Sequence, residues 1–270
     1  MTRRAGVTLV ELLVGVVLTA SLFLLGFALL GQMQRTVQRG AVRSESWSRL
    51  AGGVQLLRDD LAEVSPGDVL VMEPSRIVYR AWRGTGISCG RTIDGILLRT
   101  SRFQALRLPS AGRDSLSIFR DVQTTGSGWY PMAITGPPRS GVCTDGTGAG
   151  ALVVPTPITD SLVLPVPVRF FEVMEIRLYQ SGGRWWVGAR SVSNGEVIQP
   201  VMGPVASSGL QFQFLDQGGG SISSPTALRR ITVRLTTTMD DRDALSGAAS
   251  GGVGRRDSML ATVRQPWRFR

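Results

Sequence analysis

A single carboxylate, Glu11, stands at the start of a long apolar run. The residues after it, Leu12 to Leu30, are nineteen uncharged side chains in succession. A charged side chain at the centre of a bilayer costs about 3 kcal/mol even on the most lenient scale, so Glu11 requires a partner of opposite charge. The apolar run contains no cation. Cleavage of the chain after Gly6 would supply one, because the new ammonium group on Val7 can pair with the Glu11 carboxylate of a neighbouring copy or subunit.

The residues around Glu11 resemble a known processing signal. The stretch Arg3-Arg4-Ala5-Gly6-Val7-Thr8-Leu9-Val10-Glu11-Leu12 is similar to the class III signal of type IV pilins and pseudopilins. The resemblance implies that a membrane prepilin peptidase cuts between Gly6 and Val7 and methylates the new N-terminus on Val7. It also implies that Glu11 guides assembly of the helix with other pilins or pseudopilins into a filament.

Two simpler interpretations compete with the pilin-like one. A secretory signal would have a shorter apolar core and an A-x-A cleavage site, whereas this run ends in Leu30-Gly31-Gln32. A plain single-pass membrane anchor fits the length, since about 20 helical residues span a bilayer. It leaves Glu11 unexplained, so the pilin-like interpretation is preferred.

The composition excludes most enzyme classes. The chain contains no histidine and no lysine, so it cannot form a His-based triad or a Ser-Lys dyad. Asp240-Asp241-Arg242-Asp243 groups carboxylates, but it lacks the EF-hand pattern and is interpreted as a solvated turn. We therefore expect no enzymatic activity, no cofactor and no metal site.

The only two cysteines, Cys89 and Cys143, are expected to form a disulfide, because an even pair in an exported chain is typical of one. Two free buried thiols are the alternative. A bridge closing a loop of about 55 residues stabilises a domain by roughly 4 kcal/mol in the chain-entropy model.

The charges at the N-terminus predict the topology in the membrane. Arg3 and Arg4 precede the apolar run, and the positive-inside rule keeps such a segment in the cytoplasm. The expected precursor is a single-pass inner-membrane protein with an extracytoplasmic main domain. Its predicted parts are a leader peptide (1–6), a transmembrane and assembly helix (7–31), an amphipathic continuation of the helix (32–65) and a β-rich globular domain (66–270).

The helix is expected to run from about Val7 to Val64, ended by Pro66-Gly67. One helical face is predicted by the spacing of three and four between apolar residues. Gly52-Gly53 weakens this second half and predicts a bend. The apolar residues of that face are Trp47, Leu50, Val54, Leu57, Leu61 and Val64.

After Pro66 the sequence period changes to two, which predicts short strands and an α+β fold with a loop-rich antiparallel β domain. A hairpin is predicted with a turn at Gly182-Gly183. Residues 124–150 are predicted as a long loop with one short strand near Trp129 to Ile134. The strands are expected at 69–73, 76–82, 96–100, 103–108, 116–120, 173–179, 184–190, 197–202, 210–215, 228–238 and 259–264.

This order of elements adjusts the expected subclass. The hairpin, then Pro200 to Val205, then Leu210 to Phe214 and a final Val/Leu/Thr strand together resemble PilW-like minor pilins and the larger J-type minor pseudopilins. A large glycine-rich domain is bulky for a repeating shaft. The resemblance therefore implies a minor subunit that primes or caps filament assembly.

The basic C-terminal third suggests an alternative function. The formal charge is +10, or +8 once Arg3 and Arg4 leave with the leader, and all of the cations are arginines. Arginines beside Trp267 and Phe269 are typical of a surface that contacts single-stranded DNA, as in the tip subunit of a competence pilus. Scattered solvent-facing arginine is the simpler explanation. The candidate DNA contacts are Arg229, Arg230, Arg255, Arg256 and Arg268.

Overall fold

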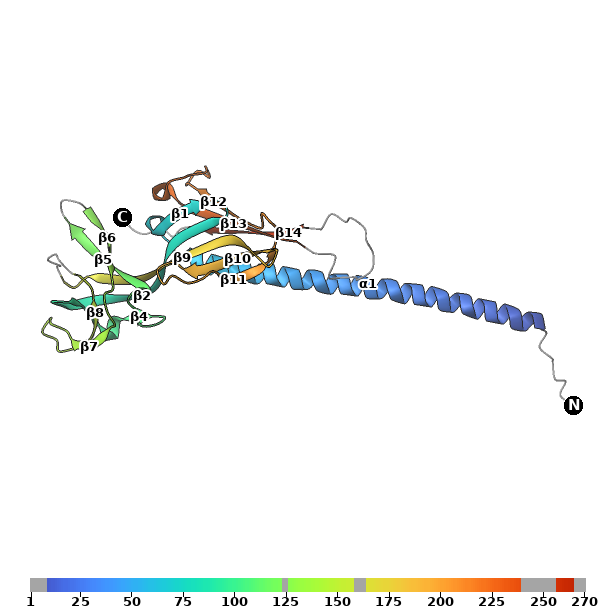
Figure 1. The fold of residues 1–270 in the computed structure, drawn as a ribbon, viewed down its shortest axis with the longest axis horizontal. Helices are drawn as coiled ribbons and strands as arrows, with labels where there is room; N and C mark the ends of the chain where they lie inside the picture. The colour runs from blue at the N-terminus through green and yellow to red at the C-terminus, as the bar shows by residue number, and fades with distance from the viewer. Residues whose placement is uncertain (1–8, 123–125, 158–163, 239–255, 265–270) are drawn as a thin grey trace. The chain divides into compact units, whose positions relative to one another are not determined.

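The computed structural model describes residues 9–122, 126–157, 164–238 and 256–264, which form an N-terminal helix and a β-rich domain (Figure 1). The contacts between residues divide the described chain into two units, with the boundary inside the helix between Arg49 and Leu50. The predicted boundary between the assembly helix and its continuation lay at residues 31 and 32, closer to the N-terminus.

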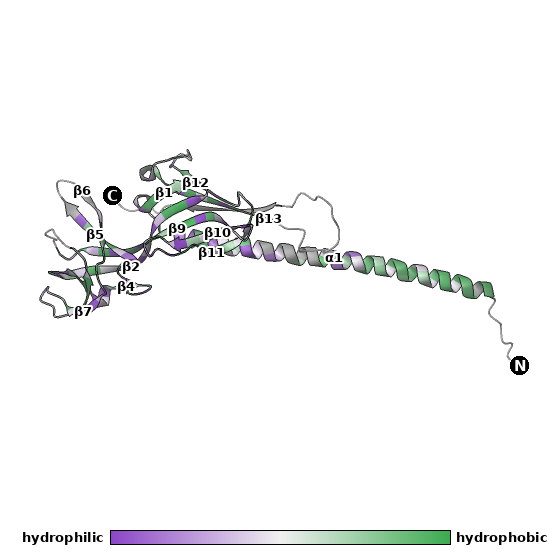
Figure 2. Ribbon diagram, viewed as in Figure 1, coloured by the Kyte–Doolittle hydropathy of each residue, from purple (hydrophilic) through white to green (hydrophobic). Residues whose placement is uncertain are grey.

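The helix α1 spans Leu9–Ala62. Its segment Leu12–Gln34 has a mean hydropathy of 2.6 and is long and apolar enough to cross a membrane. Figure 2 shows this part of α1 as the continuous hydrophobic stretch of the helix. The expected apolar helix is therefore confirmed.

The second half of α1 contributes to the core of the β domain. Leu50, Leu57 and Leu61 are at most 1% exposed and Val54 is also buried, as the spacing predicted. Complete burial of a leucine side chain stabilises the fold by roughly 1.5–3 kcal/mol. Trp47 departs from the prediction, because it lies before the boundary and is 37% exposed.

The helix continues through Gly52-Gly53, and it ends at Ala62, two residues before the expected position. A 3-10 turn, η1 (Pro66–Asp68), follows it. The backbone N–H of Ser65 donates to Asp68 Oδ2 over 3.0 Å, which reverses the chain into the first strand.

The main sheet is antiparallel and has eleven strands. Its central path runs in the order β11-β10-β9-β2-β3-β8-β7, with β1 and β4 also paired to β2, and β5 paired to both β6 and β9. The long strands β2 and β9 hold the sheet together, because they pair with each other from Arg76 opposite Arg177 to Ile87 opposite Pro167. The strands are β1 (Val69–Glu73), β2 (Arg76–Thr92), β3 (Gly95–Arg99), β4 (Gln104–Ala105), β5 (Asp114–Val122), β6 (Gly126–Ala133), β7 (Arg139–Val142), β8 (Gly150–Pro155), β9 (Pro167–Ser181), β10 (Arg184–Ser191) and β11 (Gln199–Val205).

A second sheet has the order β12-β13-β14, formed by β12 (Leu210–Leu215), β13 (Arg230–Thr238) and β14 (Arg256–Arg264). The alternation of Leu210, Phe212 and Phe214 places their side chains in the core, as predicted. The largest hydrophobic core lies between this sheet, the main sheet and the second half of α1.

Two sequence predictions about the strands were wrong. Residues 103–108 pair only at Gln104 and Ala105, because β4 meets β2 over two positions and then turns away. The short strand expected near Trp129 to Ile134 is present as β6, paired with β5, but the long loop predicted around it is wrong, because residues 124–150 also contain β7, paired with β8. The glycines and prolines of this stretch conceal the alternation of β6 and β7.

Candidate functional site

The N-terminal assembly residues lie only in part within the described structure. Gly6 and Val7 precede the described residues, and Glu11 belongs to the first turns of α1. The backbone of α1 thus carries Glu11 directly before the candidate span Leu12–Gln34.

The candidate span is exposed among the residues that the structure describes. None of the residues in its apolar window is buried, and Leu24 and Phe27 are more than 70% exposed. Exposed apolar area of this extent requires cover from lipid or from other helices, at about 25 cal/mol for each Å² removed from water. The span is therefore a candidate surface for contact with lipid or with other helices.

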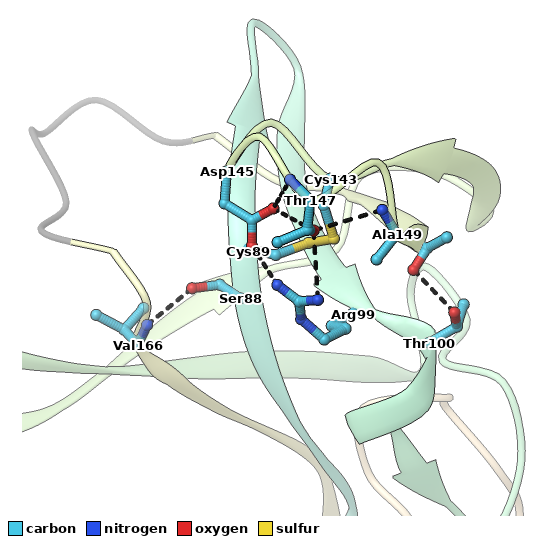
Figure 3. Close-up of a disulfide and its surroundings, with 10 residues drawn as sticks. Ser88, Cys89, Arg99, Thr100, Cys143, Asp145, Thr147, Ala149 and Val166 are labelled. Atoms are coloured by element: carbon cyan, nitrogen blue, oxygen red, sulfur yellow. Dashed lines mark hydrogen bonds and ion pairs between the residues drawn. A yellow bond between two sulfur atoms is a disulfide. The ribbon is translucent and has the colours of Figure 1, made fainter.

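Cys89 and Cys143 form the expected disulfide, with an S–S distance of 2.01 Å and a Cα–Cα distance of 5.3 Å (Figure 3). Both sulfur-bearing side chains are buried beside Leu97, Ala151 and Val153. The bridge links β2 to the residue after β7. It therefore ties the short strands β7 and β8, at one end of the sheet path, to the long strand β2.

Polar contacts support the loop beside the disulfide. Arg99 of β3 forms an ion pair with Asp145, and the backbone N–H of Thr147 donates to Asp145 over 3.1 Å (Figure 3). The pKa of Asp145 is lowered mainly by the hydrogen bond from the Thr147 hydroxyl, and also by the bond from the Thr147 backbone N–H. Ser88 accepts a hydrogen bond from the backbone N–H of Val166 over 2.9 Å. The contacts of Arg99 hold the disulfide loop against β3, and the Ser88 contact joins β2 to the residue before β9.

Glu172 of β9 lies at the centre of a buried charge cluster. It is 1% exposed, and its carboxylate accepts hydrogen bonds from Arg113 Nε (2.7 Å), Arg83 Nε (3.0 Å) and Arg107 Nη2 (3.3 Å). Arg107 also bonds the buried Asp114, on β5, directly opposite Glu172. The cluster connects β2, β5 and β9 where the sheet passes from one core to the next.

The arginines keep this carboxylate ionised. Burial by itself raises the pKa of Glu172, but hydrogen bonds from Ser191, Arg113 and Arg83 outweigh burial and lower the pKa to about 2. A carboxylate with such a pKa stays ionised near neutral pH and is a poor general acid or base there. The cluster is suited to holding strands together.

Glu175 repeats the arrangement three residues further along β9. Its side chain is fully buried between Arg76 of β2, which lies on one side, and Arg190 of β10, which lies on the other. Burial opposes ionisation, yet the hydrogen bonds from Arg76 and Arg190 lower the pKa of Glu175. The two arginines and the glutamate join three adjacent strands.

Of the five arginines that the sequence proposed as DNA contacts, the structure describes the side chains of Arg229 and Arg230. Arg229 is exposed and donates to the carbonyls of Thr226 and Leu228, and Arg230 begins β13. In the register of the second sheet, Arg256 lies opposite Thr238, eight residues from Arg230 along β13, or about 27 Å. Arg255 and Arg268 fall outside the described residues, as does the side chain of Arg256.

A groove lies beside the β9–β10 hairpin, and no pattern in the sequence predicted it. The hairpin itself is confirmed, with positive φ at Gly182 and Gly183 in its turn. Trp185 and Trp186 are successive residues of β10, so their side chains point to opposite faces of the sheet. Trp185 packs against the main core, and Trp186 lines an open groove together with Tyr179.

Comparison of the chain with protein-family models, with curated proteins and with solved structures gives no match.

Proposed function

We propose that this protein is a minor pilin or minor pseudopilin that primes or caps the assembly of a type IV pilus-like filament after cleavage of its leader. The proposal is carried by the contrast between the exposed N-terminal part of α1 and its buried C-terminal part. No residue in the apolar window of Leu12–Gln34 is buried by the described part of the chain, whereas Leu50, Leu57 and Leu61 of the same helix are core residues of the β domain. Such a helix is suited to joining a bundle of similar helices while it holds a globular domain.

The processing signal supports the same function. Cleavage between Gly6 and Val7 would create the ammonium group that Glu11 requires, and the pairing would lower the cost of burying both charges as the subunit leaves the bilayer. In this proposal the precursor is an inner-membrane protein whose β domain is extracytoplasmic. The disulfide between Cys89 and Cys143 fits that location, because disulfides persist in oxidising compartments.

The mature N-terminus tests the proposal directly. Mass spectrometry of the protein from cells with an active prepilin peptidase should find residues 1–6 removed and one methyl group on the Val7 amine. The same protein from cells without the peptidase, or carrying Gly6→Leu, should retain Met1. An intact Met1 in the peptidase-positive cells would overturn the proposed function.

Assembly is tested separately from processing. Glu11→Ala should still be cleaved, but it should fail to enter the sheared filament fraction or to support filament formation. Glu45→Ala is the matched control, because Glu45 is an exposed carboxylate of the same helix and its ion pair with Arg49 is solvent-exposed. Normal assembly of Glu11→Ala would instead favour a plain membrane anchor.

A further inference from the structure

The groove beside the β9–β10 hairpin lies on the face of the main sheet that points away from the largest core. Its volume is about 800 Å³, and it is open to solvent. Tyr179 and Trp186 are opposite each other in the β9–β10 register and line it, with Ile198 and Pro200 along one wall. Their strand neighbours Leu178 and Val187 pack into the core, so the two aromatic side chains share the outer face.

Each of the two rings lies over a glycine of the next strand. A β-carbon built on Gly188 would come within 2.5 Å of Cε1 of the Tyr179 ring, and one on Gly203 within 2.6 Å of Cε3 of the Trp186 ring. The glycines thus let the rings lie against the backbone. The Trp186 indole is also fixed by a hydrogen bond from its Nε1 to the Ser181 carbonyl, over 3.3 Å.

Tyr179 and Trp186 both line the groove and are partly exposed to it. Both residues are half-buried, and neither ring pairs with another ring or a guanidinium among the described residues. By contrast, Trp82 and Trp129 on another part of the sheet have Arg169 over their faces. Tyr179 and Trp186 therefore form a preformed aromatic platform.

Two arginines flank the platform on the same face of the sheet. Arg177 and Arg184 each lie two residues from a ring, on opposite sides of the Tyr179–Trp186 pair, so about 13 Å of strand separates them. Arg184 is exposed, and the Nε of Arg177 is buried without a hydrogen-bond partner within the described residues. Glu175, two residues before Arg177 on the same face, is already bonded by two other arginines, Arg76 and Arg190.

We propose that this groove binds single-stranded nucleic acid, with bases stacked on Tyr179 and Trp186 and phosphates held by Arg177 and Arg184. Planar guanidinium groups match phosphate oxygens, and aromatic faces accept any base. The groove lining contains no carboxylate, the usual acceptor for the hydroxyl groups of a neutral sugar. A duplex keeps its bases stacked within the helix and does not offer them to a recessed platform. The site goes beyond the proposed role in filament assembly.

Binding can be measured with the purified full-length protein in non-ionic detergent, by fluorescence anisotropy of a labelled dT20 oligonucleotide. Trp186→Ala should weaken binding at least about fivefold, because stacking of one base supports that much affinity. The double variant Arg177→Gln/Arg184→Gln should reduce the slope of log K against log salt by about 1.4, or about 0.7 for each lost phosphate contact. Trp186→Phe should retain part of the affinity.

The matched control is Arg58→Gln/Arg102→Gln, which removes the same charge from two exposed positions outside the groove and should leave binding unchanged. Circular dichroism and thermal unfolding would establish that each variant is folded. If Trp186→Ala does not fold, the affinity of Arg184→Gln is measured instead. Unchanged affinity of the groove variants, equal affinity for a duplex, or binding of an acidic polysaccharide without binding of dT20 would each overturn the proposal. The measurement needs no filament, so it succeeds or fails independently of the assembly function.

Discussion

Gly53 of α1 lies directly against the side chain of Met202 on β11, so that a β-carbon at Gly53 would meet the thioether sulfur. The adjacent Gly52 has nothing within 4 Å of the equivalent position. The two glycines of the helix therefore differ in function. Gly53 permits close contact between α1 and the main sheet, whereas Gly52 only reduces helix propensity.

Leucine substitutions should separate these two glycines. Gly53→Leu should lower the free energy of unfolding by about 1–3 kcal/mol, because the added side chain overpacks the contact with Met202. Gly52→Leu should raise it by about 0.5–1 kcal/mol, because it faces solvent and leucine is the better helix former. Urea unfolding in detergent, followed by tryptophan fluorescence, measures both. Equal effects of the two substitutions would contradict the contact.

Removing the charge of Glu172 should be strongly destabilising. Glu172→Gln leaves Arg83, Arg107 and Arg113 without their shared carboxylate, and breaking a buried ion pair on one side costs about 3–5 kcal/mol. Glu73→Gln is the control, since Glu73 is a half-exposed partner of Arg76 and such pairs contribute about 0–1 kcal/mol. If both variants unfold at the same urea concentration, the cluster does not stabilise the domain.

Acid should destabilise the domain in a defined pH range. The pKa of Glu172 is lowered from 4.5 to about 2 on folding, so its stabilisation is complete above about pH 4.5 and is lost as the pH falls towards 2. This shift in the pKa of Glu172 corresponds to about 3 kcal/mol in the free energy of unfolding. The pKa of Glu175 is also lowered, so acid removes its stabilisation as well. Burial raises the pKa of Asp68 instead, so protonation of Asp68 favours the folded state.

Urea unfolding of the parent protein and of Glu172→Gln between pH 7 and pH 2.5 would measure this dependence. The variant should lose less stability over the range, because the titrating group is absent. Parallel curves for the two proteins would assign the acid sensitivity to other carboxylates.

Loss of the disulfide should weaken the domain without changing its topology. The bridge spans 54 residues, and the chain-entropy model gives about 4 kcal/mol for a loop of this length. Cys89→Ser/Cys143→Ser should lower the free energy of unfolding by up to that amount. Reductant should lower the stability of the parent protein and have no effect on the double variant, which serves as the control.

The parts of the fold that the sequence predicted are those with local patterns. The spacing of Leu50, Leu57 and Leu61 identified the buried face of α1, and alternation around Gly182-Gly183 identified the β9–β10 hairpin. A helix or hairpin depends on neighbours in the sequence, so its pattern is complete within a short window.

The charge clusters and the groove depend on distant residues instead. Glu172 meets Arg113, Arg107 and Arg83, which lie 59, 65 and 89 residues earlier in the chain. Only the pairing of β9 with β2 and β5 brings these side chains together. The groove likewise requires Gly203 of β11 beneath Trp186, a contact that no sequence period reveals.

The carboxylates of β9 have consequences for the environments in which the domain can persist. The cations that enclose Glu172 and Glu175 are all guanidinium groups, which keep their protons even in strong base. Alkali therefore has no means of discharging either cluster, and only acid can. We therefore expect these two clusters to persist at alkaline pH and to be lost in acid.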